Sequence, residues 1–244
     1  MPDMSKWLVT TFHQAAPFSL RATRSTSWAA SSLLLPTPYA VKMGLLDAAF
    51  RRGDGARVET LFNLLKGRTI RFRPPNRLAV TGTLVRILRE PKNKKEAKDP
   101  FIPSVAYREF VEYAGPLQIA TDIADLDRAD VAWLADLFRH VNYWGKRGGF
   151  FTWSAESMAE TLTDDFTVPV IPAKPEASAP WSLDAMFQEL DDIGEKASWP
   201  SVNTYSEASA KLGRDRVLVA TLIPMRRVAT VHNRSLYVRL GEER

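Results

Sequence analysis

The chain has 244 residues, a formal net charge of +5 and no cysteine. Its apolar fraction of 45% and charged fraction of 25% are ordinary for a soluble globular protein, and this length can bury a sizeable core in one large domain or two small ones. The lack of cysteine excludes disulfides, thiolate metal sites and cysteine nucleophiles, and without an apolar run of about 18 residues or a signal peptide we expect a cytoplasmic protein with no membrane span.

The charge is divided unevenly between the two parts of the chain. Residues 1–100 hold 18 lysines and arginines against 7 acidic residues, whereas the remaining 144 residues carry a net charge of −6. Such a basic half predicts a polyanion partner, and the acidic half predicts protein partners or solvent. The alternative is that the basic side chains only keep surface loops solvated.

The first elements are a strand and a helix joined by a basic segment. Residues 6–13 alternate β-branched and aromatic residues with polar ones, which predicts a strand. A basic, hydroxyl-rich run follows at residues 21–28. A helix is then predicted from Pro38, because proline suits a first helical turn and Thr37 before it can cap the helix, and Gly53 ends the apolar periodicity.

The segment SSLLLPTPYAVKMGLLDAAF carries a resemblance to a known family. It resembles the CRISPR-associated Cas protein five family of the RAMP superfamily of RNA-binding subunits, in which a proline element leads into the first helix. The matching residues are Leu35, Pro36, Pro38, Lys42, Gly44, Leu45, Leu46, Asp47 and Ala48. The resemblance implies a subunit of a type I Cascade surveillance complex that caps the 5′ handle of the guide RNA. It also implies contacts with the backbone subunit and the large subunit, and indirect contact with target DNA through the complex.

A second helix and a long basic hairpin are predicted next. Residues 58–65 have helical spacing and end at Gly67. Residues 68–113 are predicted to form a long antiparallel hairpin with a polar, lysine-rich tip. The resemblance implies that this hairpin is a thumb crossing the guide RNA. Its candidate RNA-binding residues are Arg68, Arg71, Arg73, Arg77, Lys92, Lys94 and Lys95.

The remaining elements complete the predicted fold. A strand at residues 117–121, a helix at 125–140 capped by Asp127, and a strand at 150–153 give, with the first elements, the order β-α-β-β-α-β of an α+β, ferredoxin-like (RRM-like) domain over residues 1–167. Residues 168–244 are predicted to form a proline-rich linker and a β-rich extension packed on the same fold. The extension is expected to hold a helix at 182–192 and strands at 217–223 and 235–240.

A glycine-rich loop at residues 145–149 is a candidate phosphate site. Glycines allow backbone N–H groups to approach phosphates closely, and Lys146 and Arg147 beside Gly148 add positive charge. The loop has neither the spacing of a Walker loop nor that of a dinucleotide fingerprint, so it predicts neither nucleotide hydrolysis nor hydride transfer. The alternative is a tight turn between helix and strand.

Two further groups are candidate RNA contacts. Lys42 lies close to Pro38 and Tyr39, and a cation near a helix N-terminus opposes the helix dipole unless an anion, here a phosphate, is bound. The alternative is a solvated lysine. The cations and ring of the basic run suit single-stranded RNA, although Trp28 fits a core position equally well. The residues of this run are Arg21, Arg24 and Trp28.

The histidines show no catalytic or metal-binding pattern. His13, His140 and His232 are scattered, the adjacent pair at residues 191–192 reads as surface charge, and no cofactor or metal is predicted. We therefore expect a non-catalytic protein. The alternatives are a metal-independent endoribonuclease that processes precursor guide RNA, for which His13, Tyr39 and Lys42 would have to converge, and a generic single-stranded RNA-binding module.

Overall fold

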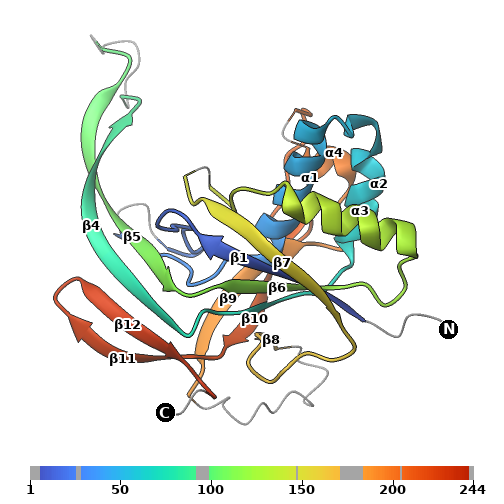
Figure 1. Cartoon of the computed structure of the whole chain (residues 1–244). Coiled ribbons are helices and arrows are strands. Elements are labelled where there is room, and N and C mark those ends of the chain that lie inside the picture. Colours follow the sequence, from blue (N-terminus) through green and yellow to red (C-terminus); the bar gives the residue numbers. More distant parts are fainter. Residues whose placement is uncertain are drawn as a thin grey trace.

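The computed structural model describes residues 6–25, 29–91, 99–146, 148–170, 184–203 and 205–241. It is an α+β protein in which three mainly antiparallel sheets combine with a small group of helices (Figure 1). The predicted α+β class is confirmed. No helix in the described part of the chain has the length and apolar character needed to cross a membrane.

A four-stranded sheet forms the centre of the molecule. Its strand order is β3-β6-β1-β7, and every neighbouring pair is antiparallel. The bounds are β1 Trp7–Gln14, β3 Ile70–Arg73, β6 Leu117–Asp122 and β7 Phe151–Ala159. The strands predicted at residues 6–13 and 117–121 are therefore confirmed, because their alternating patterns place one row of apolar side chains in the core.

Helices lie together on one side of this sheet (Figure 1). Rings from sheet and helix meet there, with the centroids of Phe12 and Phe138 6.3 Å apart. The helices are α1 Pro38–Arg52, α2 Val58–Lys66 and α3 Arg128–Arg139, with a short 3₁₀ turn at Gly55–Arg57 between the first two. All three were predicted from their apolar periodicity.

The ends and packing of α1 follow from its sequence. The Thr37 hydroxyl accepts a hydrogen bond from the Ala40 N–H at 3.1 Å, and Gly53 takes a left-handed conformation, with φ of 94°, just after the helix. Gly44 faces Trp144 so closely that an added Cβ would lie 3.0 Å from the indole ring. A glycine at this position therefore lets the helix approach the core.

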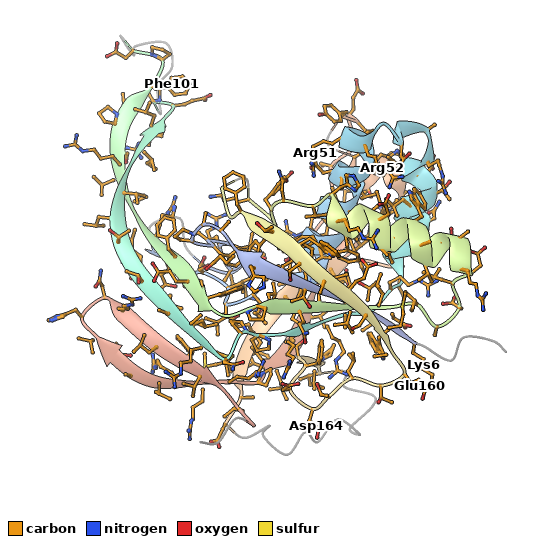
Figure 2. All side chains as sticks on the ribbon, viewed as in Figure 1. Lys6, Arg51, Arg52, Phe101, Glu160 and Asp164 are labelled. Atoms are coloured by element: carbon orange, nitrogen blue, oxygen red, sulfur yellow. The ribbon has the colours of Figure 1, made fainter. Side chains whose placement is uncertain are left out.

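A long hairpin projects from the body as a curved arm (Figure 1). It consists of β4 Arg77–Arg89 and β5 Ile102–Ala114, which pair without a break from Arg77↔Ala114 to Arg89↔Ile102. Side chains stand out along the arm up to Phe101 near its end (Figure 2), and Leu84 and Leu88 are each 71% exposed. The arm begins later than the predicted range 68–113, because residues 70–73 pair with β6 in the central sheet.

The C-terminal segment adds strands to the body and to the arm. β8 Val168–Pro169, β9 Met186–Ile193 and β10 Arg216–Ile223 form a three-stranded sheet, and α4 Trp199–Val202 lies between the last two strands. β11 Met225–Val231 and β12 Arg234–Arg239 extend the sheet of the arm, whose order is β11-β12-β4-β5-β2, with β2 at Ala29–Ala30. The strands predicted at residues 217–223 and 235–240 are confirmed as β10 and β12.

The helix predicted at residues 182–192 is wrong. Residues 186–193 form β9, which pairs with β10 at eight consecutive positions. The segment has polar and acidic residues that suit a helix, but its pairing with the β-branched strand β10 and the burial of Leu190 and Asp191 override this local preference.

Candidate nucleic-acid interface

A cavity of about 690 Å³ lies along α1, from Tyr39 in its first turn to Phe50 near its end. We call it the α1 pocket. It is bounded by α1, by the glycine-rich loop after α3, and by the C-terminal segment that carries β9, α4 and β10. Its lining includes Leu20, Tyr39, Ala40, Met43, Asp47, Phe50, Tyr143, Gly145, Lys146, Asp191, Trp199, Asn203, Tyr205 and Arg216. Aromatic rings and charged groups thus share one concave surface.

Tyr39 is held in the pocket by a charged neighbour. The guanidinium carbon of Arg216 lies 4.8 Å from the centre of the Tyr39 ring, and Asp191 accepts a hydrogen bond from Arg216 at 2.5 Å. Burial raises the pKa of the Tyr39 hydroxyl, although the positive charge of Arg216 acts in the opposite direction. The ring is therefore neutral and fixed in orientation, which suits a stacking platform.

The glycine-rich loop brings a lysine to the same pocket. Gly145 and Gly148 have φ angles of 73° and 108°, which side chains rarely adopt, and the Gly149 N–H donates to the Lys146 carbonyl at 3.3 Å. The loop is thus a tight turn, as the alternative interpretation proposed, and it also places the exposed Lys146 in the pocket lining. Arg147 lies outside the described residues.

Lys42 does not reach the pocket, and the prediction that it faces a phosphate is wrong. Its side chain is fully buried, and its ammonium group lies 2.7 Å from Asp192 on β9 and donates to the Lys66 carbonyl at 3.2 Å. Burial lowers the pKa of Lys42 and raises that of Asp192, while their mutual attraction opposes both shifts. An anion does accompany the cation near this helix start, but it is a carboxylate of the protein itself.

The basic run before α1 flanks the three-stranded sheet. Arg24, whose side chain is 74% exposed, forms an ion pair of 2.7 Å with Glu189 on β9. Glu189 and Asp191 are two residues apart on one strand, so their side chains share a face and Arg24 lies on the side of the sheet that borders the pocket. Arg21 is exposed, Pro38 is buried in the first turn of α1, and Trp28 lies outside the described residues.

Most of the arginines predicted along residues 68–77 hold other parts of the chain. Arg77 is exposed at the root of the arm. The other three make internal contacts: Arg68 with Asp125, Arg71 with the Thr167 carbonyl at 2.5 Å, and Arg73 with Asp165 at 2.5 Å. These three arginines therefore hold parts of the fold together and do not form a continuous basic surface for RNA. The predicted lysines Lys92, Lys94 and Lys95 lie outside the described residues.

Residues that sequence reasoning missed come from the C-terminal segment. Arg216, Asp191 and Trp199 line the pocket, and Tyr205 beside them is 90% exposed. Asp191 was predicted to be surface charge, but it is buried against Arg216. The aromatic residues Trp199 and Tyr205, between β9 and β10, are visible in the sequence. The sequence does not reveal that the segment carrying them lies beside α1.

The three residues of the predicted nuclease site do not share a surface in the described structure. Tyr39 lines the α1 pocket, Lys42 is buried beneath it, and His13 is exposed on β1 outside the pocket lining. Among the described residues, no group of three histidine, aspartate or glutamate side chains is arranged to hold a metal ion.

Comparison with known proteins relates the chain to CRISPR systems. No protein-family model matches the sequence. The chain has a weak structural similarity, with a TM-score of 0.43 and 9% identity, to the crystal structure of a CRISPR protein from Archaeoglobus fulgidus, over 97% of this chain and 92% of that chain. CRISPR-associated protein Cas5 from Archaeoglobus fulgidus is 26% identical over 208 residues, covering 84% of this chain and 88% of the relative. The chain is therefore similar to a Cas5 protein along most of its length, which confirms the resemblance carried by the α1 segment.

Proposed function

We propose that this protein is a Cas5-type subunit of a type I Cascade complex and that it holds the 5′ handle of the guide RNA in the α1 pocket. The observation that carries the proposal is the meeting of Tyr39 and Lys146 in one cavity of about 690 Å³, in a chain similar to a Cas5 protein. A platform ring beside a cation is the combination that binds single-stranded RNA, because bases stack on the ring while the cation neutralises phosphate.

In this proposal each pocket residue has a distinct role. Tyr39, held by Arg216, receives a base, and Lys146 with the loop amides contacts the adjoining phosphate. Trp199 stacks against Phe50 with ring centroids 6.2 Å apart and an interplanar angle of 29°, so it forms a rigid apolar wall. The cavity exceeds the size of a single base, which leaves room for a nucleotide with part of its neighbour.

The arrangement of the body supports a ferredoxin-like RAMP domain. The strands of the central sheet alternate with α1 and α3 in the order β-α-β-β-α-β, and the arm is inserted between the two middle strands. In this proposal the arm of β4 and β5 is the thumb that crosses the RNA. The domain covers residues 1–167 and the extension 168–244 completes the α1 pocket. The proposed partners are the backbone and large subunits, with target DNA reached through the complex in the cytoplasm.

Binding of a fluorescein-labelled single-stranded RNA to the full chain, titrated against salt, tests the site. Lys146→Ala should reduce the log–log salt slope by about 0.7, the value for one phosphate contact, and Tyr39→Leu should weaken binding about fivefold or more through lost stacking. Lys6→Ala is the charge-matched control, because Lys6 is exposed at the end of the central sheet (Figure 2), where its N–H donates to the Ala159 carbonyl at 3.0 Å, and it does not line the α1 pocket. Unchanged affinity and slope in both pocket variants would refute this site.

We also propose that the chain does not cut RNA. Its support is the separation of His13, Tyr39 and the buried Lys42. Incubation of the purified chain with a repeat RNA in the presence of a chelator checks this directly. Cleavage at a defined position would contradict it.

A further inference from the structure

A second cavity, of about 330 Å³, lies where the arm joins the body. We call it the arm-root pocket. Polar side chains dominate its wall, and its lining includes Tyr107, Glu109, Gln188, Arg227, His232 and Asn233. We propose that this pocket binds one nucleotide of single-stranded RNA, with the base against Tyr107 and the phosphate against Arg227 and His232. The proposal rests on the proposed function for the source of that RNA.

The acidic and amide walls of the arm-root pocket are fixed by backbone contacts. The Glu109 carboxylate accepts a hydrogen bond from the Ser32 N–H at 2.8 Å, and the Gln188 carbonyl oxygen accepts one from the Leu34 N–H at 2.9 Å. Both side chains are thus held before any ligand arrives. A preorganised polar wall binds a ligand without the cost of ordering those side chains.

The basic wall is fixed by the turn between β11 and β12. His232 has a left-handed φ of 51°, the only positive value among the described residues other than glycine, and such a conformation costs free energy that its surroundings must supply. Asn233 stabilises this conformation, because two hydrogen bonds join it to the arm. Its carbonyl accepts from the Gly82 N–H at 2.8 Å, and its side-chain amide donates to the Gly82 carbonyl. Arg227, on the same hairpin, hydrogen-bonds the Tyr237 hydroxyl.

The flat side of the pocket is the ring of Tyr107. This ring lies across β4 at Gly82, where an added Cβ would be 1.7 Å from the Tyr107 hydroxyl oxygen. A glycine at this position is therefore a condition for the ring to lie there. The ring presents a surface on which a base can stack, and stacking is tolerant of base identity.

The mixture of charges indicates a nucleotide rather than a simple anion. Arg227 and His232 offer donors to a phosphate, whereas Glu109 would repel phosphate and suits an amino group on a base edge. The volume fits one nucleotide and excludes a duplex. Leu20 lines the α1 pocket and Ala22 lines the arm-root pocket, so a single strand could follow the segment between the two cavities toward the arm.

Two pairs of variants test the proposal in the full chain, with a fluorescein-labelled 12-nucleotide single-stranded RNA as the probe. Arg227→Gln should lower the salt slope by about 0.7, whereas Arg226→Gln removes the same charge from the opposite face of β11 and should leave the slope unchanged. Tyr107→Leu should weaken binding about fivefold or more, whereas Thr83→Ala on the other face of β4 should not. Circular dichroism establishes that each variant is folded.

The outcomes separate this proposal from the proposed function. If the variants of Arg227 and Tyr107 bind like their controls while Lys146→Ala and Tyr39→Leu bind weakly, the arm-root pocket is not a nucleotide site and the α1 site stands. If only the arm-root variants bind weakly, the α1 site fails and the arm-root pocket stands. Equal slope changes for Arg227→Gln and Arg226→Gln would reduce the effect to overall charge and overturn the proposal.

Discussion

The buried ion pair between Lys42 on α1 and Asp192 on β9 should make the stability of the protein sensitive to single changes and tolerant of a double one. Asp192→Asn leaves a fully buried ammonium group without its counter-charge, which we expect to cost about 3–5 kcal/mol of unfolding free energy. Lys42→Met should cost less, because the side chain of Asp192 is 20% exposed and water can reach the carboxylate that remains. The double variant Lys42→Met/Asp192→Leu should lie within about 1 kcal/mol of the wild type, since an apolar pair avoids the desolvation of both charges.

Urea denaturation followed by circular dichroism measures all four proteins of this double-mutant cycle. The pH dependence provides a second reading. Because burial raises the pKa of Asp192, the wild type should lose stability as pH rises from 3.8 through the raised value. Because burial lowers the pKa of Lys42, it should gain stability as pH rises from the lowered value toward 10.5. The double variant should show neither change.

Two results would refute this reasoning. Single variants that each unfold at the wild-type urea concentration would mean that Lys42 and Asp192 are not paired in a dry interior. A double variant whose loss equals the sum of the single losses would mean that the two residues act independently. An RNA-binding loss confined to Lys42→Met, with normal stability, would restore the phosphate role that the structure does not support.

Three further changes probe other parts of the fold. Gly44→Val should destabilise by about 1–3 kcal/mol, measured in urea, because the new side chain meets Trp144. Burial opposes ionisation of Asp165, but hydrogen bonds from neighbours including Arg73 lower its pKa. The ionised carboxylate should therefore stabilise the protein above pH 3.8, and this stabilisation should be lost as the pH falls through the lowered pKa. The urea midpoint of Asp165→Asn should accordingly change less with acid than that of the wild type. Removing residues 91–99 should weaken RNA binding while the circular dichroism spectrum stays unchanged, and an unfolded deletion variant would contradict this.

The sequence was sufficient where local chemistry decides the outcome. α1 begins at a capping threonine followed by proline and ends at a glycine, and these signals act over a few residues. β9 was predicted as part of a helix at residues 182–192, and its acidic and polar residues carry no strong strand preference. Its conformation depends on β10, more than 20 residues later, and no local pattern reveals that partner.

The candidate site divides along the same line. Tyr39 and Lys146 were predicted from the proline element and the glycine loop, and the structure brings both into the α1 pocket. Their neighbours Arg216 and Trp199 come from the C-terminal segment, which folds back beside α1. Their role depends on a long-range contact, so the sequence alone could not assign it.

The charge imbalance between the two parts of the chain has a meaning other than the one first expected. Within the described ranges, several ion pairs join a basic residue of the first 100 to an acidic residue of the remainder, among them Arg24–Glu189, Lys42–Asp192, Arg52–Asp136, Arg68–Asp125 and Arg73–Asp165. Acidic residues of the second part thus neutralise several basic residues of the first part within the fold. The number of lysines and arginines in the sequence therefore overestimates the positive charge available to bind RNA. Lys146, which lines the α1 pocket, comes from the acidic part itself. Local placement beside an aromatic ring, rather than net charge, is therefore the property that identifies the candidate interface.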